Sequence, residues 1–375
     1  MSFLRHLWRN ERHRRVLLAL LGAAVAFVFV VFRRTDFVKN LALIVGGVGA
    51  ATAVFLGLYF LVNLLPEKLR EKLQALPFIL FALVFAVGGL FVSAVGTVIA
   101  SFHDDINGKK FVGFDNYKSI WTTLDSRLAV VNSFLWVFLG TAIVVTLGLT
   151  IARFADGMRG ESIAKLTIFL PVAISLVGAG ITWKFIYAEN GFLFQAGLLN
   201  QLTKLAHLPY SMGGGPEGRN WVLERGIGGI QPPRWAPGFN TLLLIIIFIW
   251  SQAGIATVVL SAAIKGVPQE LIEAATVDGA TRSEVFRKVT VPYIKGTIAT
   301  VTSLVALASL KAFDIVAATT GGNFGTSTLA TEFYRKKFTE IRDGAGAALA
   351  VALFLLCFPI VVWNRRVQRH VEETN

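Results

Sequence analysis

Residues 240–263 read NTLLLIIIFIWSQAGIATVVLSAA, without a single charged side chain. An α-helix rises about 1.5 Å per residue, so about 20 apolar residues cross the roughly 30 Å hydrocarbon core of a bilayer. This stretch is therefore long enough and apolar enough to span a membrane. The same rule predicts further spans at 16–32, 40–65, 77–101, 128–152, 166–188, 296–318 and 344–363. The sequence predicts an all-α membrane protein, a polytopic bundle of about eight transmembrane helices.

The composition agrees with this fold class. Of the 375 residues, 54% are hydrophobic and only 16% are charged, whereas a soluble globular domain carries about 25% charged residues. The formal net charge is +13, and most of the Lys and Arg residues lie in short segments between the apolar stretches. That distribution is typical of topology signals and anionic-lipid contacts, and it argues against a nucleic-acid interface.

Charge distribution also predicts the orientation of the chain. A basic run over 5–15 precedes the first apolar stretch, which ends at Arg33-Arg34 without a small-x-small cleavage site, so we predict an uncleaved first span. The segments between predicted spans fall alternately on the two sides of the membrane. Lys and Arg are denser in the segments on the side that holds the N-terminus than in those on the other side. The positive-inside rule then places both termini in the cytoplasm. A further surface helix is predicted over 66–74.

The polar stretch 264–295 follows the first quoted span and carries helix-boundary signals. Pro268 suits the first position of a helix, where its missing N–H costs nothing. Glu270 and Glu273 would then lie near the positive end of the helix dipole. Asp278-Gly279 ends this helix, because glycine readily adopts the left-handed conformation of a helix C-terminus.

A second short helix is predicted directly afterwards. Thr281 and Glu284 have the spacing of a capping box, and Pro292 marks the end of the helix before the next span. In the first helix Leu271 and Ala275 are four residues apart and form a small apolar face edged by carboxylates. Local signals leave two interpretations open: a slim helix that enters a groove of another protein, or a capped connector that packs on its own spans.

The wider pattern carries a family resemblance. Glu273-Ala274-Ala275 followed by Asp278-Gly279-Ala280, with Phe286 and Pro292 beyond, resembles the EAA loop of permeases in binding-protein-dependent ABC importers. Three other segments are similar to the carbohydrate-uptake branch, which includes maltose and sn-glycerol-3-phosphate permeases. They are Phe111–Tyr117, Lys311–Val316 and the run from Thr320-Gly321-Gly322 to Ser327-Thr328-Leu329-Ala330.

The resemblance implies a domain organisation. It covers a permease core of six spans over 77–370, with an external loop at 189–239 and a cytoplasmic coupling loop at 264–295. Residues 1–76 would be an N-terminal extension with two extra spans. The family is found in the bacterial cytoplasmic membrane, and it implies a multi-pass protein there.

The resemblance also implies partners and roles. A second permease subunit, two ATP-binding subunits and an extracytoplasmic solute-binding protein would complete the importer. ATP and Mg would bind to the ATPase subunits, and this chain would hold no cofactor. Glu273 would be the charged anchor of a coupling helix, while Ala274, Ala275, Asp278, Gly279 and Ala280 shape it. The sequence contains no Gly-x-x-x-x-Gly-Lys-Ser/Thr phosphate loop, so we predict a non-enzymatic subunit.

Polar residues inside predicted spans are candidates for the substrate path because they are costly in lipid, and aromatic residues are candidates because their rings can stack on a sugar. They are Trp183, Tyr187, Trp250, Gln252, Lys311 and Asp314. Lys311 and Asp314 share one helical face, where they would form a structural ion pair or line a wet cavity. The aromatic rings would stack on a sugar or belong to the interfacial belt. Pro171 is expected to kink the span 166–188.

Substrate and energy source have alternatives at this stage. A neutral di- or oligosaccharide is favoured over glycerol phosphate, because few cationic groups lie in the predicted path. An ion-gradient-driven secondary transporter would use Lys311 and Asp314 but leaves the loop 264–295 unexplained. His103-Asp104-Asp105 would hold a metal ion or, more simply, begin a polar loop. No nucleophile or metal constellation supports an enzyme.

Overall fold

A computed structural model describes most of the chain. The described residues are 55, 59, 62–63, 66–104, 110–188, 198–205, 225–226 and 231–374. They belong to two compact units, Met1–Ser93 and Ala94–Asn375, each described by itself. The predicted span 16–32, most of 40–65 and most of the loop 189–239 lie outside the described residues, so the two extra N-terminal spans stay a prediction.

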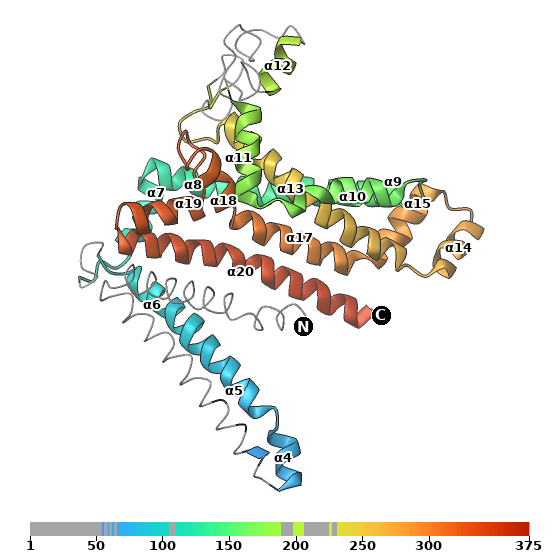
Figure 1. The fold of residues 1–375 in the computed structure, drawn as a ribbon, viewed down its shortest axis with the longest axis horizontal. Coiled ribbons are helices and arrows are strands. Elements are labelled where there is room, and N and C mark those ends of the chain that lie inside the picture. The colour runs from blue at the N-terminus through green and yellow to red at the C-terminus, as the bar shows by residue number, and fades with distance from the viewer. Residues whose placement is uncertain are drawn as a thin grey trace, which may run out of the picture. The chain divides into compact units, whose positions relative to one another are not determined.

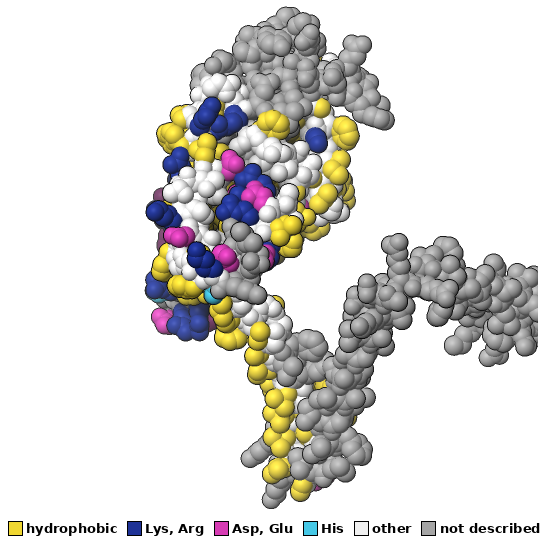
Figure 2. Space-filling model, turned by 90° about the vertical axis from the view of Figure 1, so that its left-hand side faces the viewer, with side chains coloured by type: hydrophobic (Ala, Val, Ile, Leu, Met, Phe, Trp, Pro, Cys, Tyr) yellow, Lys and Arg dark blue, Asp and Glu magenta, His cyan; other side chains and the backbone are white. Residues whose placement is uncertain are grey.

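The first unit contains a short helix followed by a long apolar one. Helix α4 (Glu67–Leu73) lies within 66–74, where the sequence predicts a surface helix. Helix α5 (Leu76–Phe85) runs on through the π-helical η1 (Ala86–Phe91) into α6 (Val92–Ala100), and the sequence boundary between the two units falls within α6. This run coincides with the predicted span 77–101. Hydrophobic side chains line its exposed surface (Figure 2).

The second unit is a helical bundle (Figure 1). Its elements are α7 (Asp115–Thr122), α8 (Leu124–Leu135), η2 (Trp136–Gly140), α9 (Thr141–Ala155), α10 (Glu161–Phe169), η3 (Leu170–Ala173), α11 (Leu176–Tyr187), α12 (Leu198–Leu205), α13 (Phe239–Lys265), α14 (Gln269–Val277), α15 (Arg282–Val285), η5 (Phe286–Thr290), α16 (Val291–Tyr293), α17 (Lys295–Leu310), α18 (Phe313–Thr319), α19 (Leu329–Tyr334), η6 (Arg335–Thr339) and α20 (Asp343–Thr374). Within the described ranges the β-structure is limited to an isolated bridge between His103 and Phe111.

Among the described residues, four helices are long and apolar enough to cross a membrane: Leu124–Ala155, Phe239–Lys265, Lys295–Thr319 and Asp343–Glu373. They match the predicted spans that begin at 128, 240, 296 and 344. Together with one bent helix pair they give four or five candidate spans in the part of the chain that the structure describes. The expected total of about eight is therefore only partly matched there.

The predicted continuous span 166–188 is wrong in one respect. Helices α10–η3 and α11 form a broken pair with a 99° bend. Pro171 lies in a 3₁₀ turn, and Ile174 then takes an extended conformation with ψ 132°. Ser175 caps the new helix by accepting a hydrogen bond from the Gly178 N–H at 3.1 Å. The chain breaks here, instead of kinking, because the capped start of α11 satisfies backbone groups that a kink would leave unpaired.

Helix α13 lies at the centre of the core. Leu244, Ile247 and Phe248 are fully buried in it, and Trp136 of η2 packs edge-on against Phe248 at 5.6 Å. Helix α9 approaches α13 so closely that a Cβ at Gly148 would lie only 2.7 Å from the Cβ of Ala256. Close approach through small residues is the usual way for helices to associate in membranes.

Candidate functional site

The loop 264–295, which the family resemblance makes a coupling loop, has the two-helix form that its sequence predicts. Helix α14 ends where Gly279 adopts a φ of +82°, and the N–H of Ala280 donates to the carbonyl of Ala275 at 3.0 Å. Pro268 differs from its expected place, because it is the N-cap and the helix begins one residue later. The backbone therefore makes a sharp left-handed turn directly after the Glu273-Ala274-Ala275 segment.

A reciprocal capping box begins the second helix. The Glu284 N–H donates to Thr281 Oγ1 at 3.3 Å, and the Thr281 N–H donates to Glu284 Oε2 at 3.0 Å. The Thr281 backbone and hydroxyl, followed by Lys288, lower the pKa of Glu284 to about 2. The chain then stays helical through Pro292 to Tyr293. Arg153, in the last turn of α9, stacks on the Phe286 ring at 4.3 Å and attaches this segment to the bundle.

Helix α14 is solvent-accessible along its whole length. No residue in it is buried, and Leu271 and Val277 are 44% and 87% exposed. Glu273 is exposed on the same helix. Helix α14 lies at one end of its unit, and α7 and α19 lie at the other (Figure 1). Exposed apolar and acidic side chains on a helix at this position favour contact with another protein over packing on the chain's own spans.

The structure brings three of the substrate-path candidates together. Trp183 of α11 contacts Tyr187 of the same helix, with the ring centroids 5.4 Å apart, and Trp250 of α13, with the ring centroids 5.7 Å apart. Tyr187 is buried and donates its hydroxyl proton to the Leu243 carbonyl at 3.1 Å, so its role includes holding α11 on α13. Trp183, Trp250 and Gln252 are half-buried.

Lys311 and Asp314 lie on the two sides of a turn within the candidate span Lys295–Thr319, and not on one continuous helix as expected. Helix α17 ends at Leu310, Ala312 has φ −70° and ψ 47°, and α18 begins at Phe313. The N–H of Phe313 donates to the Lys311 carbonyl at 2.6 Å, which closes a tight turn between them. Among the described residues no ion pair joins the two side chains. Lys311 is exposed and Asp314 is half-buried.

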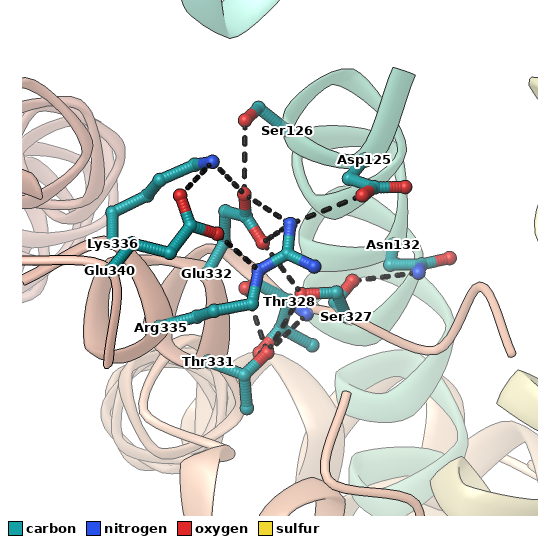
Figure 3. Close-up of polar contacts among 10 residues, drawn as sticks. All are labelled: Asp125, Ser126, Asn132, Ser327, Thr328, Thr331, Glu332, Arg335, Lys336 and Glu340. Carbon is teal, nitrogen blue, oxygen red and sulfur yellow. Dashed lines mark hydrogen bonds and ion pairs between the residues drawn. The ribbon is translucent and has the colours of Figure 1, made fainter. Parts of the chain in front are cut away.

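Sequence reasoning missed a buried charge network at the end opposite α14 (Figure 3). Glu332 of α19 is fully buried. Its carboxylate accepts hydrogen bonds from Ser126 of α8 at 3.1 Å and from Arg335 at 2.8 Å. Arg335 also reaches Asp125 at 3.2 Å. The network therefore fixes α19 to the start of α8.

A second set of contacts extends this network. Lys336 donates to Glu340 at 2.8 Å, and Asn132 of α8 donates to the carbonyls of Gly325 and Ser327 at 2.8 and 2.7 Å. Figure 2 shows this end of the unit, where basic and acidic side chains are interspersed. The spacing of Glu332, Arg335, Lys336 and Glu340 at three and four residues was the available signal, because such residues share a helix face.

A further ion cluster links Asp156 and Lys165 with the end of α13, next to the coupling loop. Asp156 and Lys165 lie in one predicted loop, whereas Ser261 lies at the end of a predicted span about a hundred residues later. Residue spacing in the sequence therefore did not predict their contact. Metal binding at His103-Asp104-Asp105 finds no support: one ring nitrogen of His103 is 2.7 Å from the Ile99 carbonyl. In the described part of the chain no group of three or more His, Cys, Asp or Glu is arranged to hold a metal, and Asp105 lies outside it.

Comparison of the sequence with known proteins identifies the family. Residues 232–373 match the model of the binding-protein-dependent transport system inner membrane component. The osmoprotective compounds uptake permease GgtC of Synechocystis is 40% identical over 286 residues, which cover 76% of this chain and 95% of the relative. The α-glucoside transport permease AglF of Rhizobium meliloti is 39% identical, over 69% of this chain and 72% of the relative.

A solved structure shares the fold. The bacterial alginate ABC transporter, crystallised with an alginate-bound periplasmic protein, contains a chain that matches with a TM-score of 0.62. The identity is 20%, and the match covers 81% of this chain and 97% of the other. Taken together, the capped and exposed EAA loop, the apolar bundle and these relatives show that the chain belongs to the family of inner-membrane permease components of binding-protein-dependent ABC importers.

Proposed function

We propose that this permease subunit couples ATP hydrolysis to sugar uptake through helix α14, which inserts into a groove of a separate ATPase subunit. The exposure of the whole helix carries this proposal. Glu273 would be the anchor on the ATPase, and the left-handed turn at Gly279 sets the angle between α14 and α15. ATP and Mg would bind to two such ATPase subunits, and a second permease subunit would complete the membrane part.

The substitution pair Glu273→Lys with Gly279→Pro tests this coupling. The first reverses the charge of the proposed anchor. The second forces a φ near −65° at a position that requires +82°. We expect the double variant to insert into the membrane normally but to lose ATP-dependent uptake and substrate-stimulated ATPase activity in the reconstituted complex. Glu372→Lys, a charge reversal at an exposed residue near the C-terminus, is the matched control. Full substrate-stimulated hydrolysis in the double variant contradicts the proposal.

The proposed substrate is a neutral di- or oligosaccharide of the glucoside type. Support comes from two relatives named for osmoprotective compounds and for α-glucosides. The half-buried rings of Trp183 and Trp250 offer apolar faces of the kind that stack on sugar rings. An external solute-binding protein would deliver the sugar. Glycerol phosphate is the alternative, with Lys311 as the only candidate cation that we place in the path.

Replacement of one ring separates the sugar-stacking role from a general packing role. We expect Trp250→Ala to raise the KM for uptake of an α-glucoside several-fold, while Trp235→Ala, at a 61% exposed ring outside the spans, leaves it unchanged. An unchanged KM in both variants would place the sugar elsewhere.

A second experiment separates ATP-driven import from an ion-gradient mechanism. Vanadate should inhibit uptake, and uptake should continue in the presence of an uncoupler.

A further inference from the structure

A compact ion cluster joins three helices beside the coupling loop. Lys165 of α10 donates to Asp156 at 2.5 Å, to Glu161 at 2.6 Å and to the Ser261 hydroxyl of α13. Ser261 donates in turn to the same Asp156 oxygen at 2.7 Å. Lys265, the last residue of α13, pairs with Glu161. A single ammonium group therefore holds the α9–α10 turn, α10 and α13 together.

The cluster is shielded enough for its charges to depend on one another. The side chains of Lys165, Asp156 and Glu161 are only 17%, 15% and 22% exposed. Two carboxylates face two ammonium groups, and the second oxygen of Asp156 is buried without a hydrogen-bond partner. Removal of the central ammonium would leave two carboxylates close together with reduced access to water, which is unfavourable in a partly buried site.

The cluster lies next to the start of the coupling helix. After Lys265 only Gly266, Val267 and Pro268 precede α14. This connection between α13 and α14 is short and held in place: the Gly266 N–H donates to the Ala262 carbonyl at 3.1 Å, and Val267 is buried. A displacement of α14 would therefore act on the last turn of α13, where Ser261 and Lys265 contact the cluster.

A second contact keeps α10 on α13 further along. A Cβ at Gly254 would lie 2.6 Å from the Ile168 carbonyl oxygen and 2.8 Å from the Phe169 Cα, so the two backbones are in direct contact there. Beyond this point the chain bends by 99° into α11, which carries Trp183 against Trp250. Helix α10 is thus attached to α13 at two points and leads to the aromatic group.

From these contacts we propose that Lys165 is a positioning residue, which transmits the displacement of α14 to the broken span α10–α11 and so to the substrate path. The inference rests on the proposed coupling role of α14. Lys165 touches neither ATPase nor substrate in this scheme. It acts by making the end of α13 and the start of α10 move together.

The test uses the complete importer in proteoliposomes, with its binding protein and maltose as the probe sugar, after wild-type stimulation by that sugar is established. The readouts are ATPase stimulation by the loaded binding protein and the number of ATP molecules hydrolysed per sugar imported. Coupling residues commonly change coupling by a factor of about 2 to 30. We expect Lys165→Gln to reduce the stimulation ratio by about tenfold and to raise ATP per sugar, with basal ATPase activity unchanged. Lys165→Arg should restore coupling, since it keeps the charge.

Controls distinguish coupling from folding. Lys337→Gln removes a more exposed ion pair, to Asp343, outside the loop 264–295, and should leave the stimulation ratio unchanged. If Lys165→Gln does not assemble, Ser261→Ala decides, because it removes only the hydroxyl. A loss of stimulation of about twofold or more in that variant supports the proposal. If the importer with Lys165→Gln assembles, a stimulation ratio and an ATP-per-sugar value equal to wild type overturn the proposal. If it does not assemble, wild-type values for Ser261→Ala overturn it. A wild-type importer that no loaded binding protein stimulates would instead contradict the proposed function itself.

Discussion

Glu332 shows how much one buried charge can determine at the residue scale. It is fully buried, yet it accepts hydrogen bonds from Ser126 and Arg335, and Lys336 lies 3.9 Å away. A buried carboxylate without such partners would be strongly unfavourable. The residue therefore binds α19 to α8 only while its cationic neighbours are present, and these neighbours also reach Asp125 and Glu340.

The stability of this network can be measured directly. Glu332→Ala leaves Arg335 and Lys336 short of a partner at 34% and 10% side-chain exposure. Removing one member of a buried ion pair costs about 3–5 kcal/mol, so we expect a marked fall in the thermal unfolding temperature of the purified subunit in detergent. Asp343→Ala breaks the more exposed Lys337–Asp343 pair and should cost at most about 1 kcal/mol. Equal effects of the two substitutions would contradict the role of burial.

Gly254 gives a second prediction at this scale. An added Cβ would meet backbone atoms of Ile168 and Phe169 at 2.6 and 2.8 Å, and backbone cannot move aside as a side chain can. Overpacking of this kind typically costs about 1–3 kcal/mol, so Gly254→Ala should lower the unfolding temperature. Gly96→Ala is the matched control, because its Cβ would meet nothing within 4 Å. An unchanged unfolding temperature for Gly254→Ala would show that α10 is not held tightly on α13.

At the scale of elements, the sequence predicts best where the deciding interactions are local. The end of α14 at Gly279 and the capping box of α15 follow from residues within four positions of each other, and both are confirmed. The broken span α10–α11 was expected only as a kink. Pro171 was visible in the sequence, but the extended Ile174 and the cap by Ser175 depend on where α11 packs against α13 and α18.

The capping box supports a prediction with a pH dependence. Thr281→Ala removes the side-chain acceptor for the Glu284 N–H and should cost about 1 kcal/mol of local helix stability. Because Glu284 has a folded pKa of about 2 against an ordinary 4.5, its contribution is fully present above pH 4.5 and disappears as the pH falls towards 2. Amide hydrogen exchange over 282–285, corrected for intrinsic rates, should be faster in Thr281→Ala at pH 7. In wild type it should become faster only below pH 4.5, and a rise above that pH would contradict the assignment.

At the scale of the whole molecule, hydropathy predicts which segments cross the membrane but not which of them meet. The spans that begin at 128, 240, 296 and 344 could be read from length and composition alone. The contacts of Lys165 with Ser261 and of Glu332 with Ser126 could not, because these partners lie about a hundred and about two hundred residues away along the chain. Among the candidate sites, the coupling loop was predictable because its signals are contiguous. The separation of Lys311 from Asp314 was not, since a break at Ala312 leaves no mark in the hydropathy.

The arrangement of α17 and α20 predicts the topology of the chain. Gln368, near the end of α20, donates to the carbonyl of Gly296 at the start of α17 at 2.8 Å, so the C-terminus and the coupling loop lie on one side of the bundle. In a Cys357→Ser background, Glu273→Cys and Glu373→Cys should both react with an impermeant maleimide only in inverted vesicles. Trp235→Cys, just before α13, should react only from the outside. Labelling of the first two from opposite sides would contradict the fold. Labelling of both from outside would leave the fold intact but contradict the orientation drawn from the positive-inside rule, and with it the coupling role proposed for α14.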